Sequence, residues 1–396
     1  MVCKHEMFDG LGYTVERTED LFSVCVTDSQ RQIGRCKGAL VDASLNGAVV
    51  KAMVLGAVFT EPEYRRRGIA RNCFRVLDSI MQEQGVLLSY LHPFSFSYYR
   101  TMGYERVADH RELTFPMDRL NFLPVYTDVQ RCAFADGTQE LIEAYHRFSQ
   151  NRNILFRRDG AQATLEPGSM AAYMYGKPYE YRFKDIRYFV SHDADGCPDG
   201  YVMLHLEMEQ REHHLFGTLH VDELCFDSPA VLRKLLGFLR TYQGEVDTVV
   251  IHNCAMAPEV EKVLQHYKYT NIRVIPDLAA RVHNVPALLA SVSYPAEKGS
   301  FTVRVTDSVK SPFCREHTEG IWQVDYKNGD ASVTRLADDA SWDLSAPMPA
   351  FTQLIHGYES YGIQTASYLE GVELKNDCAD FFRAFPNRPC GLFELF

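Results

Sequence analysis

The sequence predicts a mixed α/β and α+β protein built from more than one unit. Its 396 residues exceed one ordinary hydrophobic core and suggest two or three domains. A strand, a turn, a helix and a second strand follow one another at residues 49–91, and the same outline returns at residues 219–251. From about residue 281 alternating strands and a hairpin signal replace this outline. We therefore expect two related α/β units, each a mixed β-sheet with flanking helices, followed by an α+β unit.

The first unit is defined by an apolar strand and the helix after it. The strand Val49–Phe59 is nearly all apolar, as expected of a strand covered on both faces. The helix 67–84 repeats apolar side chains at helical spacing, and Gly85 supplies its stop. A second strand, Val86–Leu91, and an aromatic stretch follow. Residues before Val49 are β-rich.

The run Arg65–Gly68, three arginines and a glycine, stands between that strand and that helix. The first turn of a helix has unpaired N–H groups and the positive end of the helix dipole. Gly68 lets a phosphate approach the backbone, and the arginines add positive charge. The junction therefore predicts a diphosphate site, although a solvated arginine run at a helix start would look similar. The glycine-rich loops of nucleotide triphosphatases and Rossmann proteins are absent.

The middle region repeats the outline without this chemistry. Leu219–Phe226 is predicted as a strand, Ala230–Tyr242 as a helix and Val246–Ile251 as a strand. Only Phe-Asp-Ser-Pro, residues 226–229, joins the first strand to the helix, with neither arginine nor glycine. We expect a second copy of the same fold that does not bind a diphosphate.

The last region follows a different pattern. Phe301–Thr306 alternates as a strand. Ile321–Tyr326 and Ala331–Leu336 flank the turn residues 327–330, Lys-Asn-Gly-Asp, which is a strong hairpin signal. A helix is expected at Pro349–Tyr358. These elements predict an α+β unit.

Composition describes a globular protein and limits its partners. Hydrophobic residues make up 46% and charged residues 23%, and no stretch approaches the roughly 18 apolar residues needed to span a bilayer. The formal charge of −11 argues against nucleic acid and suits a cationic acceptor, although solubility alone would also explain it. The 11 cysteines lack Cys-x-x-Cys spacing and fit reduced thiols. We expect a cytoplasmic protein that binds neither nucleic acid nor a membrane.

The junction has a recognisable spacing. Arg65, Gly68 and Ala70 form the pattern Arg-x-x-Gly-x-Ala after a strand that ends near Thr60. This pattern resembles the acetyl-CoA signature of the GNAT N-acetyltransferases.

Two further features make the resemblance more specific. The pattern His-x6-Tyr-x-x-x-Gly-Tyr is formed by His92, Tyr99, Gly103 and Tyr104. The chain also ends in phenylalanine, Phe396. Over essentially its whole length the chain resembles the enhanced intracellular survival (Eis) family of multi-acetylating aminoglycoside acetyltransferases.

The resemblance implies three domains. Residues 1–130 would form a catalytic GNAT domain, and residues 131–283 a second GNAT-like domain without the acetyl-CoA motif. Residues 284–396 would form a sterol-carrier-protein-like α+β domain whose C-terminus reaches the active site. It also implies a homo-oligomer, a hexamer.

The resemblance further implies a reaction and its residues. Acetyl would pass directly from acetyl-CoA to a primary amine of a small cationic molecule or peptide, such as an aminoglycoside-like molecule, a polyamine or lysine. Acetyl-CoA would be held by Val58, Thr60, Arg65, Arg66, Arg67, Gly68, Ile69 and Ala70. Tyr99 would be the general acid and the carboxylate of Phe396 the general base, with His92 lining the acceptor pocket. Val58 and Thr60 could instead be ordinary strand residues, Tyr99 and Phe396 could serve packing alone, and His92 could be merely hydrogen-bonded.

One departure from the family concerns the acceptor. Only 48 residues precede Val49, which is short for the strands and two helices that a GNAT domain usually places there. Those helices form one wall of the acceptor pocket, so aminoglycoside activity does not follow from the resemblance. The alternative to an enzyme is a non-enzymatic CoA- or lipid-binding protein that uses the sterol-carrier-like domain.

No metal is expected from the sequence. His205, His213 and His214, with Glu207 and Glu212, could be drawn as a metal site. They are predicted to lie on an exposed strand and turn, and their spacing matches no recognised ligand set.

Overall fold

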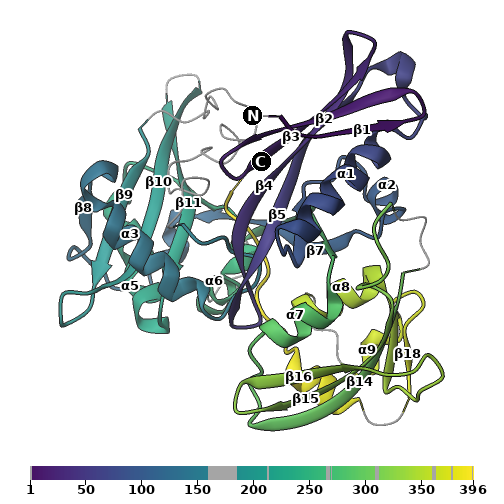
Figure 1. The fold of residues 1–396 in the computed structure, drawn as a ribbon. Coiled ribbons are helices and arrows are strands. Elements are labelled where there is room, and N and C mark those ends of the chain that lie inside the picture. Colours follow the sequence, from purple (N-terminus) through teal and green to yellow (C-terminus); the bar gives the residue numbers. More distant parts are fainter. Residues whose placement is uncertain are drawn as a thin grey trace.

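The computed structural model describes residues 2–158, 185–211, 214–264, 268, 270–307, 312–358, 363–375, 378–394 and 396. Thirteen of the strands in these residues form one sheet, and five form another. In Figure 1 the first residues form one half of the large sheet, the teal segments the other half, and the green and yellow segments the small sheet. The end of the chain lies between the two halves of the large sheet.

An antiparallel ribbon of long strands opens the chain. It consists of β1 (Val2–Phe8), β2 (Leu11–Thr18), β3 (Leu21–Asp28), β4 (Arg31–Leu45) and β5 (Ala48–Thr60). Each strand pairs with the next, so residues 2–48 form strands joined by tight turns. The described residues before β5 contain no helix, which accounts for the short N-terminal region.

The predicted strand–helix–strand unit is present. The short helix η1 (Pro62–Tyr64) leads into α1 (Ile69–Glu83), and β6 (Leu88–Leu91), α2 (Phe96–Arg100), β7 (Glu105–Pro116) and η2 (Met117–Leu120) follow. The apolar face of α1, which includes Cys73, is buried. The helix ends as predicted, since Gly85 has a φ of +67° just after the last turn.

The middle region repeats this outline. It contains β8 (Gln130–Cys132), α3 (Phe134–Ser149), β9 (Arg187–His192), β10 (Pro198–Arg211), β11 (His214–Phe226), α5 (Pro229–Leu239), η3 (Arg240–Tyr242), β12 (Thr248–Ile251), η4 (Cys254–Met256) and α6 (Glu259–Val263). The strands β11 and β12 are parallel, as are β5 and β6 in the first half.

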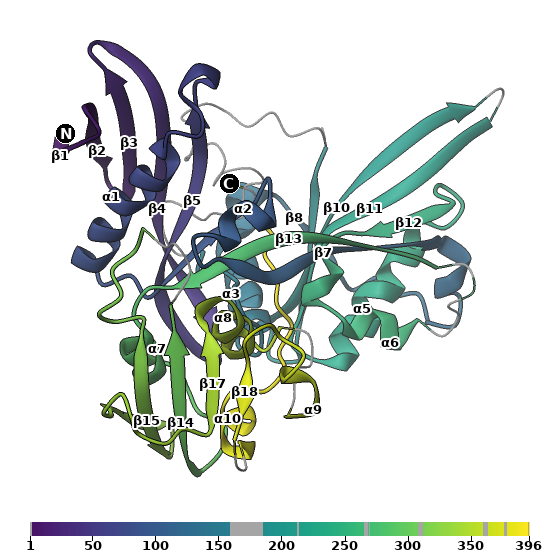
Figure 2. The same cartoon turned by 90° about the vertical axis from the view of Figure 1, so that its right-hand side faces the viewer.

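Two strands join the halves into one sheet. The strand β13 (Asn271–Val282) follows the middle region but inserts between β6 and β7, antiparallel to both. The strand β7 in turn pairs with β12. Figure 2 shows β13 and β7 running side by side across the middle of the molecule. The domain boundaries at residues 130 and 283 stay predictions.

The last region is a separate α+β layer. It contains α7 (Val285–Ser291), β14 (Lys298–Thr306), β15 (Gly320–Lys327), β16 (Asp330–Arg335), β17 (Leu344–Pro347), α8 (Met348–His356), α9 (Ile363–Ala366), β18 (Glu373–Leu374) and α10 (Ala379–Ala384). The predicted hairpin is β15–β16, and its turn residues Asn328 and Gly329 both have positive φ. No helix among the described residues is long and apolar enough to cross a membrane.

Candidate active site

The site lies at the end of β5, where the pairing of this strand with β4 and β6 is interrupted. On one side, the register with β4 shifts between Arg35 and Lys37, and Ala57 has a φ of +52°, so β5 bulges there. On the other side, β5 pairs with β6 only from Ala52 to Val54. The last residues of β5 therefore have a backbone edge that β6 does not pair. An extended molecule can add to such an edge as an extra strand.

The turn after β5 leads into the first turn of α1. Arg66 has a φ of +61° and Gly68 a φ of +80°, and a side chain at Gly68 would point into open space. Gly68 is the N-cap of α1, no side chain caps this end, and the first turn contains no acidic residue. The first N–H groups of α1 therefore have no intrahelical partners and face no nearby negative charge, which suits an anion.

These two features meet at one cavity of about 610 Å³, which we call the first cavity. It is lined by Val58, Phe59, Thr60, Tyr64, Arg65, Arg66, Gly68, Ile69, Ala70, Arg71, Phe94 and Tyr98. Seven of the eight residues predicted to bind acetyl-CoA are in this set. The eighth, Arg67, instead places its guanidinium over the ring of the lining residue Tyr64, 5.1 Å from its centre.

Tyr99 does not line this cavity but packs behind two aromatic residues that do. It is 3% exposed, and its ring centre is 5.4 Å from that of Phe94 and 5.2 Å from that of Tyr98, both of which line the cavity. Its other aromatic neighbours are Phe74 and Tyr104. The short helix α2 that carries Tyr99 starts at Ser95, whose side chain accepts a hydrogen bond from the Tyr98 N–H.

Gly103 and Tyr104 have structural roles in the turn after α2. Gly103 has a φ of +83°, and a Cβ atom there would overlap the guanidinium of Arg281. Arg281 is fully buried, donates to the Met102 carbonyl and pairs with Asp307. Tyr104 is buried as well and its hydroxyl lies 2.6 Å from Ser89 Oγ. The second half of the His-Tyr-Gly-Tyr pattern therefore fixes the backbone below Tyr99.

The end of the chain contacts His92. The ring centres of Phe396 and His92 are 4.6 Å apart, and Phe396 also lies beside Phe156. His92 Nδ1 is 3.0 Å from Asp277 Oδ1 on β13. The buried His92 Nε2 has no hydrogen-bond partner among the described residues. The structure thus brings the two predicted residues His92 and Phe396 together.

The residues just before Phe396 line a second cavity of about 180 Å³. Its lining residues are His110, Met203, Asp222, Glu223, His252, Asn253, Asp277, Leu392, Phe393 and Glu394. Asp277 belongs both to this cavity and to the His92 pair. Four of the lining side chains are carboxylates. Glu223 and Glu394 pair with Arg158, so Asp222 and Asp277 are the lining carboxylates left to attract a cation.

A buried arginine holds the terminal segment against this cavity. Arg158 donates from Nε to Glu394 at 2.7 Å and from both terminal nitrogens to Glu223. Tyr201 donates to the same Glu223 carboxylate. One guanidinium thus faces two carboxylates, and burial raises the pKa of Glu394. Glu394 Oε2 is buried without a hydrogen-bond partner among the described residues.

The corresponding junction in the second unit is closed to an anion. Ser228 caps α5 by accepting from the Val231 N–H, and Pro229 occupies the first position of the helix. Side-chain capping satisfies one of the free N–H groups, and proline has none to offer. That this junction binds no diphosphate stays a prediction, and the capped helix start agrees with it.

Sequence reasoning missed several residues beside the site. Asp277, Arg158 and Glu394 are far apart in the sequence, and no motif spacing connects them to His92 or Phe396. The expectation for His205 was wrong, because it is buried and its Nδ1 lies 2.7 Å from Asp222. Glu212 and His213, from the same set, lie outside the described residues.

Comparison with protein families gives two matches. Residues 14–107 match a family described as an acetyltransferase (GNAT) domain, and residues 174–282 match a second family with the same description. No curated protein matches significantly.

Solved structures with the same fold cover nearly the whole chain. A GCN5-related N-acetyltransferase from Anabaena variabilis has a TM-score of 0.76 at 16% identity, covering 96% of this chain and 90% of its own. An Enterococcus faecalis protein described as a probable N-acyltransferase has a TM-score of 0.73 at 20% identity, with 95% and 90% covered. Eis1 from Mycobacterium abscessus has a TM-score of 0.72 at 14% identity, with 94% and 91% covered.

The splayed parallel strands, the bulge and the uncapped helix start define an acyltransferase of the GNAT class in the first unit, and the family matches place a second GNAT domain after it. The chain thus contains two GNAT acetyltransferase domains, and its whole-chain fold is similar to that of Eis1 from Mycobacterium abscessus.

Proposed function

We propose that this enzyme uses acetyl-CoA to acetylate a primary amine of a small cationic molecule or peptide. The observation that carries the proposal is that the unpaired edge of β5 and the uncapped start of α1 meet in the first cavity. The pantetheine arm would pair with backbone groups of Val58 and Thr60. The diphosphate would accept hydrogen bonds from the backbone N–H groups of residues Arg66 to Ala70. The side chains of Arg65 and Arg66 would add positive charge.

The acceptor amine must lose a proton before it attacks. A lysine-like ammonium with a pKa of about 10.4 costs about 4.6 kcal/mol to deprotonate at pH 7. The carboxylate of Phe396 is the proposed base. Phe396 is 8% exposed and packs on His92 and Phe156, and such partial desolvation raises the basicity of a carboxylate.

The reaction would then proceed by direct transfer. The amine nitrogen forms a bond to the acetyl carbon, the carbon–sulfur bond of the thioester breaks, and the electron pair leaves on sulfur. Tyr99 is the proposed acid that gives its hydroxyl proton to the CoA thiolate. The ammonium loses two protons in becoming the amide, the first of them to the Phe396 carboxylate. One of the two returns to the Tyr99 oxygen and the other passes to solvent. A phenol and a thiol have pKa values close enough for this exchange in a closed site.

The second cavity supports a cationic acceptor. Asp222, Asp277 and Glu394 line it, and the Asp277 carboxylate also holds His92 beside the chain end. An acceptor with a second positive group could place its reactive amine near Phe396 and the other group among these carboxylates. The unpaired Glu394 Oε2 offers one acceptor atom for that group.

The C-terminal region is proposed to be a sterol-carrier-protein-like unit that serves the first unit. Its sheet has the order β16-β15-β14-β17-β18, and its interior holds the buried rings of Phe301, Trp322 and Phe351. Since the terminal segment contacts His92, the chain end is available as a catalytic group, and nothing favours the carrier alternative.

We further propose that the enzyme is a homo-oligomer, with a hexamer as the expected form. The support is exposed apolar side chains on strands of the large sheet, including Ile272, Val274 and Ile275 on β13 and Leu215 and Phe216 on β11. Such patches mark protein interfaces. Light scattering should report an assembly, and a monomer at micromolar concentration would contradict this proposal.

The function is tested by CoA release from acetyl-CoA with a panel of polyamines, aminoglycosides and lysine peptides. We expect turnover with at least one member, and weaker acetyl-CoA binding in Arg66→Glu. Arg75→Glu is the matched control, since Arg75 lies on the exposed face of α1 outside the first cavity. Failure of the wild-type protein to bind acetyl-CoA would overturn the proposal.

A further inference from the structure

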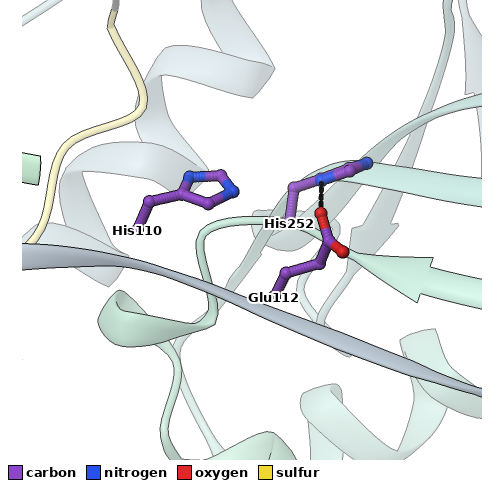
Figure 3. Close-up of side chains that lie close together, drawn as sticks. All are labelled: His110, Glu112 and His252. Carbon is purple, nitrogen blue, oxygen red and sulfur yellow. Dashed lines mark ion pairs between the residues drawn. The ribbon is translucent and has the colours of Figure 1, made fainter. Parts of the chain in front are cut away.

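Three side chains of metal-ligand type converge beside the second cavity (Figure 3). His110 and Glu112 are two residues apart on β7, so they share one face of that strand. Ile251 at the end of β12 pairs with Leu113, which brings the next residue, His252, opposite Glu112. The sheet therefore holds the three backbones in place without help from a ligand.

Their potential ligand atoms are close together. One ligand atom from each of the three residues lies within 4.8 Å of the others, and His252 Nδ1 is 3.2 Å from Glu112 Oε2. Ligands of a tetrahedral zinc ion at roughly 2.0–2.2 Å are about 3.3 Å apart. His252 and Glu112 already have that separation. One ring nitrogen of His110 lies within 4.8 Å of the ligand atoms of the other two residues, so its ring would need to turn toward them to bind the same ion.

A second layer of polar groups stands behind His252. Its Nε2 lies 3.0 Å from His220 Nδ1, and His220 Nε2 lies 3.0 Å from Glu207 Oε2. The rings of His252 and His220 are stacked within 6° of parallel. A metal-bound histidine in proteins almost always donates its other N–H to such a partner, which fixes the ring and its tautomer.

The contacts in this chain of groups share a small number of hydrogens. Glu112, His252, His220 and Glu207 are joined by three close contacts. A neutral imidazole has one N–H, and an ionised carboxylate has none. Two neutral imidazoles therefore supply two hydrogens for these three contacts, and an imidazolium would supply the third.

A divalent cation bound between Glu112 and His252 would remove the need for a hydrogen at that contact. His252 Nδ1 and Glu112 would then face the metal with lone pairs. His252 Nε2–H would donate to His220, and His220 Nε2–H would donate to Glu207. These three contacts are then satisfied with both imidazoles neutral, as metal ligands must be.

We propose that His110, Glu112 and His252 form a binding site for a divalent transition metal of the zinc type. Two histidines and a carboxylate are a known zinc ligand set that leaves a fourth position for water or another donor. Because His110 and His252 line the second cavity, that position would be open to a molecule held there. These residues differ from the histidine set considered in the sequence, and metal binding there can be measured without acetyl transfer.

Zinc titration of the full chain, freed of metal by a chelator, tests the proposal by calorimetry. We expect one tight zinc site per chain. Glu112→Gln and His252→Gln should each weaken it by more than tenfold, and Glu207→Gln by about 10–100-fold. Cobalt(II) should give the visible absorption of a four-coordinate ion in the wild-type protein, which is a readout that needs no variant.

The matched controls are Glu140→Gln and His192→Gln, which break a partly exposed carboxylate–histidine pair 3.5 Å apart elsewhere in the second unit. They should leave zinc affinity unchanged. Absence of zinc binding would overturn the proposal and mean that an extra proton fills the third contact. Equal affinity in wild type, Glu112→Gln and His252→Gln would overturn it as well, because the metal would then bind elsewhere.

Discussion

At Tyr99 the proposed chemistry depends on one hydroxyl group. Tyr99→Phe keeps the ring that packs against Phe94 and Phe74 and removes only the acid. We expect kcat to fall by about 100-fold, the lower range for a lost general acid, with little change in the acceptor KM. Tyr98→Phe, at a neighbouring ring that lines the first cavity, is the control. An unchanged kcat in Tyr99→Phe would mean that Tyr99 is not the general acid and serves only in packing.

At Phe396 the proposed base is the end of the backbone itself. A Gly-Ser extension after Phe396 moves the carboxylate and leaves every side chain in the sequence. Turnover should fall by at least about 100-fold while acetyl-CoA affinity stays the same, because the first cavity contains no residue of the terminal segment. Steady-state kinetics and calorimetry measure the two effects. The same dipeptide added at the N-terminus is the control, and full activity of the C-terminally extended enzyme would exclude the carboxylate as base.

The turn between α2 and β7 is held by a glycine that no other residue can replace. Gly103→Ala adds strain at positive φ of about 1–3 kcal/mol, and its methyl group would displace the buried Arg281. Gly85→Ala has the same kind of strain but open space around the new methyl group. Urea unfolding should show a clearly larger loss for Gly103→Ala. Equal losses would mean that Arg281 moves away at no cost.

The helix α8 carries a histidine that makes stability depend on pH. His356 is fully buried, donates from Nδ1 to the Thr352 carbonyl, and has Nε2 3.2 Å from the Tyr90 hydroxyl. Burial lowers its pKa from 6.5 to about 4. Below pH 6.5 the unfolded chain therefore takes up a proton that the folded chain does not.

The contribution of His356 to stability is complete above pH 6.5 and is lost as the pH falls toward 4. The loss amounts to roughly 3 kcal/mol at about 1.4 kcal/mol per unit. The free energy of unfolding of wild type and His356→Gln, measured across this range, gives the difference. Parallel curves for the two proteins would contradict the assignment.

Elements with strong local signals could be predicted from the sequence, and their bounds were close. The strand at β5, the helix α1 with its stop at Gly85 and the hairpin β15–β16 all follow from apolar spacing and turn residues. The first cavity could be predicted for the same reason, since its residues are nearly consecutive. The bulge at Ala57 could not, because no residue type marks it.

The arrangement of the whole molecule depends on contacts between distant residues, which local sequence patterns do not predict. The strand β13 joins the first half from a position about 170 residues later, and it brings Asp277 to His92. Arg158 fixes Glu394 across 236 positions of sequence. Residue types alone do not select such partners. The second cavity and the histidine chain behind it therefore become visible only in the folded chain.

The central claim is that the whole chain transfers acetyl directly to an amine. Mass spectrometry after incubation with acetyl-CoA carrying an isotope-labelled acetyl group, using the best acceptor of the panel, tests it most directly. We expect the labelled acetyl group to appear on the acceptor nitrogen, at a rate that far exceeds the reaction without protein. We expect no label on the protein during turnover. Label that accumulates on the protein before it reaches the acceptor, or an acceptor that stays unlabelled while acetyl-CoA binds, would contradict it.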